Sequence, residues 1–200
     1  MKNIVFDLGG VLFARDKSKC TPELLEFFSF LRAPRMPLFW EEYDRGTSTL
    51  EEVTATISGM TGRPVETCAA VLRLAVDLQE PVKPTERLVG DLKAAGYRLY
   101  VLSNMSREFI DFLRRFPVYG LFDGEVVSCE EHTVKPEPRI YEILLERYGL
   151  TPSETLFIDD REMNIEAAAA LGIHGFVLDH RDPDAACDAL RRRLLQSDCI

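Results

Sequence analysis

The chain has 200 residues, of which 46% are hydrophobic and 28% charged, and its formal net charge is −9. This length predicts one domain, or one domain with an insert, large enough to bury a core without metals or disulfides. An acidic chain lacks the basic surface that nucleic-acid backbones and anionic membranes attract, so we expect neither as a partner. The first residues do not resemble a signal peptide, and no apolar run is long enough to span a bilayer. Five scattered cysteines without a CxxC pair favour a reducing compartment, the cytoplasm.

Short apolar segments alternate with helical patterns along most of the chain. The segments have the length and composition of strands buried on both faces, and they are residues 3–6, 98–102, 124–127, 155–158 and 175–178. The helical patterns cover residues 86–95, 107–116 (with Ser106 as a possible cap), 138–148, 164–171 and 183–195. This alternation predicts an α/β fold, with a parallel sheet and helices on both of its faces.

Residues 15–82 interrupt this alternation, because they contain no convincing strand. Four helices are expected instead: one that begins at Thr21, one over residues 36–43, one that begins at a Thr49–Glu52 capping box and one over 65–78. We therefore predict an α/β core formed by residues 1–14 and 83–200, with residues 15–82 inserted as a helical subdomain.

A carboxylate and two glycines follow the first predicted strand. Asp7 stands directly after the strand, and Gly9 and Gly10 let the backbone approach a bound group. Open α/β sheets bind ligands at the carboxyl ends of their strands, so Asp7 is a candidate site residue. An Asp–Gly turn that merely closes the strand is an equally good interpretation.

Three further strand ends or loops carry polar residues. Ser103 and Asn104 follow residues 98–102 and could bind an anion, and Lys135 precedes a helix as a point charge suited to phosphate. Asp159 and Asp160 repel each other unless a cation or proton intervenes, and hard oxygen ligands suit Mg²⁺. Taken singly, each also fits a plain turn, a solvated lysine or an acidic pair at a helix N-terminus.

Together, and in this order, these motifs resemble those of the haloacid dehalogenase-like superfamily of hydrolases. Phe-Asp-Leu-Gly-Gly-Val-Leu resembles its first motif, Leu-Ser-Asn its second, Val-Lys-Pro-Glu-Pro its third and Phe-Ile-Asp-Asp-Arg-Glu-Met-Asn its fourth. The resemblance implies a three-layer, doubly wound, Rossmann-like core in which the insert is a small helical-bundle cap. The first motif resembles a branch that includes bacterial glucose-1-phosphate phosphatases.

The resemblance also implies roles for individual residues. Asp7 would be the nucleophile that accepts the phosphoryl group, and Lys135 would assist it. Phosphoryl oxygens would be held by Ser103, Asn104 and Lys135. Mg²⁺ would be bound by Asp7, Asp160 and the backbone carbonyl of Gly9. Asp159 and Asn164 would support these ligands, and Asp159 would do so either from behind them or through a water molecule on the metal.

The sequence departs from most phosphatases of this superfamily at Gly9, where they have a second aspartate that protonates the leaving group. A sugar-phosphate phosphatase could take its acid from elsewhere. Asp16, Asp44 and His132 are candidates near the cap, although each alone is expected to be a surface charge. A metal-free haloacid dehalogenase needs no acid, but the retained Asp159–Asp160 pair argues against it. A catalytically impaired binding or regulatory protein is the third interpretation.

The cap is expected to select the substrate. Phe39, Trp40, Tyr43 and Arg45 are its candidates near the cleft, with Arg45 presenting a cation and Phe39 and Trp40 better explained as cap core. A small cap favours a small phosphorylated metabolite over a protein. We therefore expect Mg²⁺-dependent hydrolysis of a small phosphomonoester, with a sugar phosphate as the first substrate class, by a monomer or homodimer.

Overall fold

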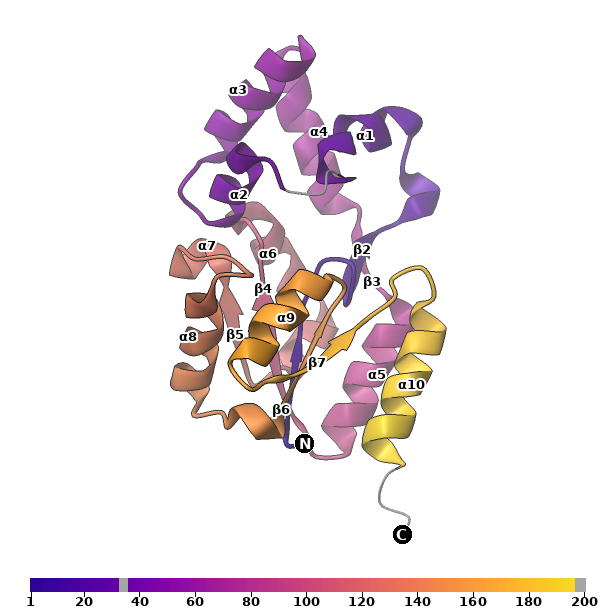
Figure 1. The fold of residues 1–200 in the computed structure, drawn as a ribbon. Helices are drawn as coiled ribbons and strands as arrows, with labels where there is room; N and C mark the ends of the chain where they lie inside the picture. The colour runs from indigo at the N-terminus through magenta and orange to yellow at the C-terminus, as the bar shows by residue number, and fades with distance from the viewer. Residues whose placement is uncertain (33–35, 197–200) are drawn as a thin grey trace.

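The computed structural model describes residues 1–32 and 36–196 and is built on one five-stranded sheet (Figure 1). All neighbouring strands of this sheet are parallel, in the order β5-β4-β1-β6-β7. The strands are β1 (Asn3–Phe6), β4 (Arg98–Ser103), β5 (Gly124–Val127), β6 (Thr155–Asp159) and β7 (His174–Val177). The five predicted strands are thus confirmed, and β1 and β5 have the predicted ends.

The strand β1 lies at the centre of the sheet. Val5 pairs with Tyr100 of β4 on one side and with Phe157 of β6 on the other. The chain builds outward from β1 through β4 to β5, and then returns to add β6 and β7 on the opposite side. The order of the strands therefore reverses next to β1, and ligands of doubly wound sheets bind in the crevice at that point.

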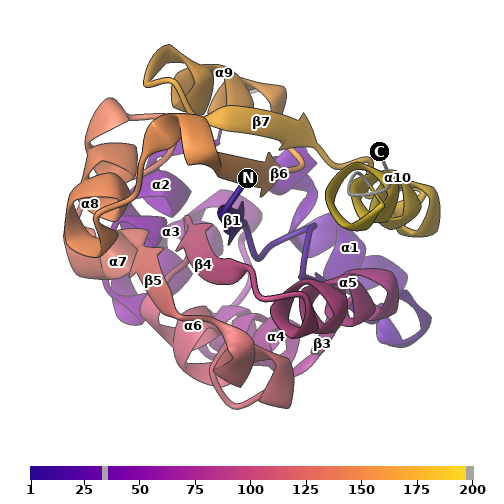
Figure 2. The same ribbon diagram turned by 90° about the horizontal axis from the view of Figure 1, so that it is seen from below.

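Helices cover both faces of the sheet, as Figure 2 shows. The alternation of side chains along β1 explains the two layers: Ile4 and Phe6 belong to one core cluster and Val5 to another. The first cluster includes residues of α5 (Lys83–Ala94), α6 (Arg107–Leu113) and α10 (Pro183–Leu195). The second includes residues of α8 (Pro138–Tyr148) and α9 (Glu162–Ala170). The predicted three-layer α/β architecture is confirmed.

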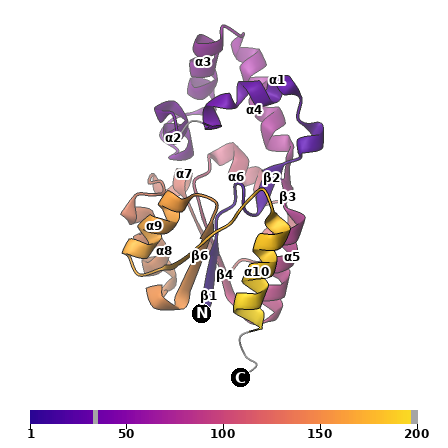
Figure 3. The ribbon, with the colours of Figure 1, turned by 45° about the vertical axis from the view of Figure 1, so that its right-hand side comes forward.

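A helical layer stands over the carboxyl ends of the strands (Figure 3). Its α-helices are α1 (Pro22–Phe27), α2 (Leu38–Asp44), α3 (Leu50–Thr61) and α4 (Val65–Asp77). They enclose an apolar cluster of their own that contains Phe28, Trp40 and Leu72, and Phe109 of α6 joins it from the core. We call this layer, residues 22–77, the cap. Because α6 contributes to the cap's apolar cluster, the cap is packed onto the core.

The two connections between cap and core run side by side as strands. Strand β2 (Phe13–Arg15) pairs antiparallel with β3 (Gln79–Pro81). The expectation of no strand between residues 15 and 82 was wrong for β3. A three-residue strand is too short to show the alternation of polar and apolar residues that is typical of a strand. Its partner β2 precedes the cap in the sequence, so no local pattern indicates the pairing.

Some helix ends differ from the prediction. Helix α5 begins at Lys83 rather than residue 86, with Pro84 in its first turn, and α6 ends at Leu113. Ser106 takes the N-cap position of α6 but makes no side-chain capping bond there. The capping box forms as expected, because Thr49 Oγ1 accepts from the Glu52 N–H at 3.2 Å and the Glu52 carboxylate accepts from the Thr49 N–H at 2.8 Å.

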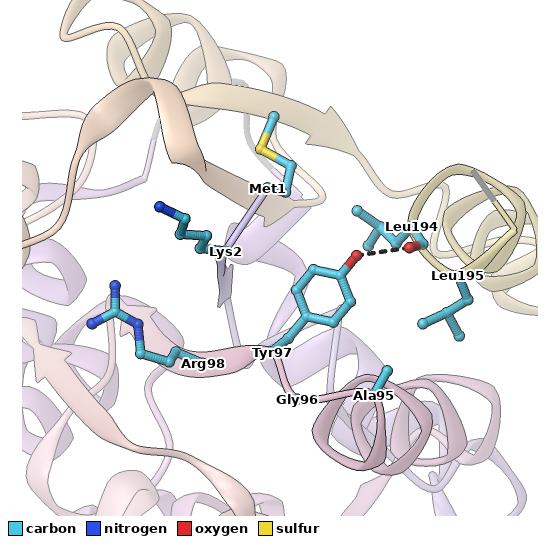
Figure 4. Close-up of a pocket in the computed structure, with 8 residues that line it drawn as sticks. All are labelled: Met1, Lys2, Ala95, Gly96, Tyr97, Arg98, Leu194 and Leu195. Atoms are coloured by element: carbon cyan, nitrogen blue, oxygen red, sulfur yellow. Dashed lines mark hydrogen bonds between the residues drawn. The ribbon is translucent and has the colours of Figure 1, made fainter. Parts of the chain in front are cut away.

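A pocket of about 500 Å³ lies at the amino ends of the strands (Figure 4). It is lined by residues that include Lys2, Arg98 and Tyr97, whose hydroxyl donates to the carbonyl oxygen of Leu194 at 2.7 Å. This is the end of the sheet opposite to Asp7. In the described parts of the chain, no helix is both long enough and apolar enough to cross a bilayer.

Candidate active site

A buried lysine joins two carboxylates at the carboxyl ends of neighbouring strands. Asp7 follows β1, Asp159 ends β6, and Lys135 lies in the loop before α8. Lys135 Nζ is 2.9 Å from Asp7 Oδ1 and 2.7 Å from Asp159 Oδ2, and its side chain is 1% exposed. It also donates to the Leu102 carbonyl at 3.0 Å. Close carboxylates and a further hydrogen bond are what make a buried ammonium tolerable, because they offset its lost hydration.

Asp159 is held from several directions. Its Oδ1 accepts from the backbone N–H of Arg161 at 2.8 Å, and the Asn164 amide lies 3.0 Å from each of its oxygens. With Lys135 on Oδ2, both oxygens of Asp159 are engaged, and the residue is fully buried. This arrangement fixes the position of Lys135, which is consistent with the supporting role predicted for Asp159 and Asn164.

The two residues that follow β4 contact different partners. Ser103 Oγ donates to Asp7 Oδ1 at 2.7 Å. The Asn104 side chain forms a pair of hydrogen bonds with the backbone of Lys135, donating to its carbonyl at 2.9 Å and accepting from its N–H at 2.7 Å. Asn104 therefore ties the loop after β4 to the loop that carries Lys135, and Ser103 directly orients Asp7. The contact of Ser103 and Asn104 with phosphoryl oxygens remains a prediction.

Three carboxylates converge beside Lys135. Oxygen atoms of Asp7, Asp159 and Asp160 all lie within 4.8 Å of one another. Burial raises the pKa of Asp7 to about 6, with Lys135 opposing it and the other two carboxylates adding to it. Burial and the charge of Asp159 likewise raise the pKa of Asp160 to about 6. Crowded carboxylates that resist ionisation are relieved by a hard divalent cation, so this oxygen set fits Mg²⁺.

Gly10 makes room for one of these carboxylates. Its φ is +79°, and a Cβ built on it would lie 2.6 Å from Asp160 Oδ2. Gly9 is exposed at the same turn, where its backbone carbonyl remains a predicted metal ligand. His180, which the sequence analysis did not single out, places Nδ1 3.6 Å from Asp160 Oδ2. It comes from the loop after β7, and no sequence motif connects it with Asp160.

The structure separates the three candidate acids. Hydrogen bonds from Ser18 and Lys19 hold the pKa of Asp16 at about 2, so it is ionised and directed to its own loop. His132 is exposed, and its Nδ1 lies 3.1 Å from the carbonyl oxygen of Arg45. Asp44 alone of the three interacts with Asp7. Burial, followed by the charge of Asp7, raises the pKa of Asp44 to about 7, although Arg161 lowers it. The expectation that Asp44 is a surface charge was wrong.

Other cap candidates lie at the contact between cap and core. Trp40 is buried in the cap's apolar cluster and Phe39 packs against it, which confirms the core interpretation of both residues. The Tyr43 hydroxyl donates to Glu108 of α6 at 2.5 Å. Arg45 was expected to offer a cation to the substrate, but its guanidinium is held by Glu41 and by both oxygens of Glu137.

A cleft of about 750 Å³ opens where the cap meets the core. Its lining comes from the α2–α3 connection and α3 on the cap side and from α6 and α7 (Ser128–Glu131) on the core side. The residues are Tyr43, Gly46, Ser48, Thr49, Leu50, Glu51, Arg107, Glu108, Cys129, Glu130 and His132. The cleft is thus bounded by the same cap segment that carries Asp44.

Known proteins are similar to this chain in sequence and in architecture. Residues 1–172 match the family described as haloacid dehalogenase-like hydrolase. The chain is 29% identical to the sesquiterpene phosphatase astK of Aspergillus oryzae, over 96% of this chain and 95% of that protein. It is 28% identical to the D-ribitol-5-phosphate phosphatase of Bacteroides thetaiotaomicron, over 88% and 91% of the two chains. A HAD family enzyme of Bacteroides thetaiotaomicron, solved with magnesium and inorganic phosphate, superposes with a TM-score of 0.72 at 26% identity, covering 90% of this chain and 95% of that one.

Proposed function

Because the chain belongs to the haloacid dehalogenase-like hydrolase family, we propose that it is a Mg²⁺-dependent phosphatase of a small phosphomonoester that works through a phosphoryl group on Asp7. The observation that carries the proposal is the buried Asp7–Lys135–Asp159 arrangement with Asp160 beside it. The two phosphatases that align with nearly the whole chain support the same reaction class.

Asp7 is the nucleophile in this proposal. Asp7 Oδ1 lies 2.9 Å from Lys135 Nζ and accepts a hydrogen bond from Ser103 Oγ at 2.7 Å. The other oxygen, Oδ2, is therefore the one that attacks phosphorus. Covalent transfer to a carboxylate splits the hydrolysis into two easier steps. Lys135 neutralises charge on the attacking carboxylate and on the phosphoryl group as they approach, which is the main electrostatic task in phosphoryl transfer.

Mg²⁺ would be held by Asp7, Asp160 and the Gly9 carbonyl, and it would screen the repulsion between the phosphate dianion and Asp7. Asp159 is committed to Lys135 and Asn164, so its contribution is to orient the lysine rather than to face the substrate. The related enzyme of Bacteroides thetaiotaomicron was solved with magnesium and inorganic phosphate, which supports a site for both groups.

The substrate class is a small phosphorylated metabolite, and a sugar phosphate is the first candidate. The cleft between the cap and the core has a volume of about 750 Å³ and polar lining groups that include Ser48, Arg107 and Glu108, although Asp7, Lys135 and Asp160 do not line it. Hydroxyl-rich ligands suit such a lining better than apolar ones do. We also propose a reducing compartment, the cytoplasm, because Cys20, Cys68, Cys129 and Cys187 are free thiols.

Phosphate release from a panel of small phosphomonoesters tests the function, with Mg²⁺ and with a chelator. The panel contains glucose-1-phosphate, a pentitol phosphate and an aryl phosphate. We expect Mg²⁺-dependent release that disappears in Asp7→Asn, a variant of nearly unchanged volume. Failure to hydrolyse any ester would favour the binding-protein alternative, and metal-independent halide release from a haloacid would favour the dehalogenase.

A further inference from the structure

None of the three carboxylates around Lys135 is free to protonate a leaving alcohol, and His180 is paired with Asp160 Oδ2 at 3.6 Å with its side chain 57% exposed. Asp7 serves as nucleophile, Asp159 is fully engaged by Lys135 and Asn164, and Asp160 is proposed as a metal ligand. Gly9 offers no side chain, and a Cβ on it would meet the terminal methyl of Met105 at 3.8 Å. An alkoxide is a poor leaving group, so a proton donor has to come from outside this cluster.

Asp44, at the carboxyl end of α2, supplies a carboxyl group on the cap side. It is half-buried and interacts with the charges of Asp7 and Arg161. The backbone N–H of Ser106, the residue after Met105, also interacts with the Asp44 carboxyl. The same short segment of the core, residues 105–106, therefore borders the empty position at Gly9 and contacts Asp44.

The backbone of Asp44 is fixed to the core. Ser128 Oγ donates to the Asp44 carbonyl, and the same Oγ accepts from the Met105 N–H at 2.9 Å. Gly46 has a φ of +73°, and a Cβ there would clash with the carbonyl oxygen of Cys129. Only glycine allows the cap segment to approach α7 so closely.

Side chains on either side of Asp44 add to this attachment. The Tyr43 hydroxyl donates to Glu108 at 2.5 Å, and Arg45 donates to the two oxygens of Glu137 at 2.6 and 2.9 Å. We call these contacts of residues 43–46 with the core the cap latch. The cap latch therefore fixes the backbone on both sides of Asp44 against the core.

We propose that Asp44 is the general acid and base of this phosphatase, supplied by the cap in place of a side chain at position 9. In the first step Asp7 bonds to phosphorus, the ester P–O bond breaks and the Asp44 proton passes to the leaving oxygen to give the alcohol. In the second step the Asp44 carboxylate takes a proton from a water molecule whose oxygen attacks the same phosphorus. The Asp7–phosphorus bond then breaks, phosphate leaves and Asp44 is again protonated. This inference rests on the proposed function.

The placement of Asp44 also ties proton transfer to cap closure. Both Asp16 and His132 point to other partners, so the donor reaches the substrate only while the cap latch is formed. Closure of a cap over a bound substrate excludes water and completes the set of catalytic groups in one movement. An open cap leaves Asp7 without a proton donor and thereby limits reaction with molecules that do not let the cap close.

Leaving-group dependence tests the assignment on the Mg²⁺-loaded enzyme. The kcat/KM value reports the phosphorylation step, so Asp44→Asn is compared with wild type on an alkyl phosphate and on p-nitrophenyl phosphate, whose phenol leaves without a proton. We expect a loss of about 10²- to 10⁴-fold on the alkyl ester and of less than about tenfold on the aryl ester. Asp44→Glu, which keeps an acid, should recover part of the loss, and Glu42→Gln on the same helix should behave as wild type.

An equal loss on both esters, or no loss on either, overturns the assignment of Asp44 and leaves the phosphatase function standing. A wild-type protein that releases phosphate from neither ester overturns the proposed function itself. If Asp44→Asn does not fold, the assignment is tested on the wild-type enzyme with a series of esters whose leaving groups differ in acidity. Its kcat/KM should change little as the leaving group becomes less acidic, and a steep decline along such a series overturns the proposal.

Discussion

Gly10 and Asp160 lie so close together that a Cβ on Gly10 would come within 2.6 Å of Asp160 Oδ2. Gly10→Ala must therefore displace the carboxylate that we assign to Mg²⁺, in addition to straining a backbone with φ of +79°. We expect the Mg²⁺ concentration for half-maximal activity to rise about 10- to 100-fold. A Mg²⁺ titration of phosphate release measures this.

Gly96→Ala is the matched control, because Gly96 has a φ of +87° but open space around the position of a Cβ. It reproduces the backbone strain without touching Asp160. An equal shift in Mg²⁺ requirement for both variants would show that strain alone accounts for the effect.

Lys135→Met should destabilise the protein strongly. The substitution leaves Asp7 and Asp159 buried without the cation that lies 2.9 and 2.7 Å from them. Removing one partner of a buried ion pair typically costs about 3–5 kcal/mol in the free energy of unfolding. Urea unfolding in the absence of Mg²⁺ measures the loss, and Lys135→Met combined with Asp159→Asn should recover part of it. A fully additive double variant would contradict the idea that unpaired Asp159 causes the loss.

The sequence was sufficient to locate the centre of the site. Asp7 and Asp159 could be placed together because the carboxyl ends of parallel strands meet at one edge, whereas Lys135 joined them only through the resemblance to the superfamily motifs. The contact of Gly10 with Asp160 and that of Arg45 with Glu137 could not be predicted, since each depends on side-chain packing that no strand end or motif indicates. Asp44 was one of several acidic residues in the insert, and only the seating of the cap on α6 and α7 distinguishes it from a surface charge.

The metal-free protein should become less stable as the pH rises from about 4 to about 6. Burial raises the pKa of Asp7 and of Asp160 from 3.8 to about 6, so in this interval these two carboxyls bind more protons in the native state than in the unfolded state. Stability falls with pH wherever that is so. Mg²⁺ replaces the protons, and we expect its stabilising effect on Tm to be larger at pH 7.5 than at pH 5.

Thermal unfolding at pH 4, 5, 6 and 7.5, with a chelator and with excess Mg²⁺, measures both effects. NaCl at the same ionic strength controls for non-specific screening by added salt. A metal-free Tm that rises between pH 4 and 6, or an equal effect of Mg²⁺ at pH 5 and pH 7.5, would be inconsistent with three crowded carboxylates as the metal site.

Arg45→Met should weaken the cap latch with little effect on the fold. The Arg45–Glu137 pair is partly exposed, with 21% and 43% of the two side chains accessible, so its contribution to stability is about 1 kcal/mol or less. Its effect on activity should be larger, because a loosened latch presents Asp44 less often. We expect kcat/KM to fall about tenfold on an alkyl phosphate and less on p-nitrophenyl phosphate.

Arg139→Met, which removes an exposed arginine paired with Glu142 and Glu146 on α8, is the control. The prediction is wrong if kcat/KM declines by the same factor in Arg139→Met, or if Arg45→Met is as active as wild type on both esters. Either result would show that the Arg45–Glu137 contact does not contribute to catalysis.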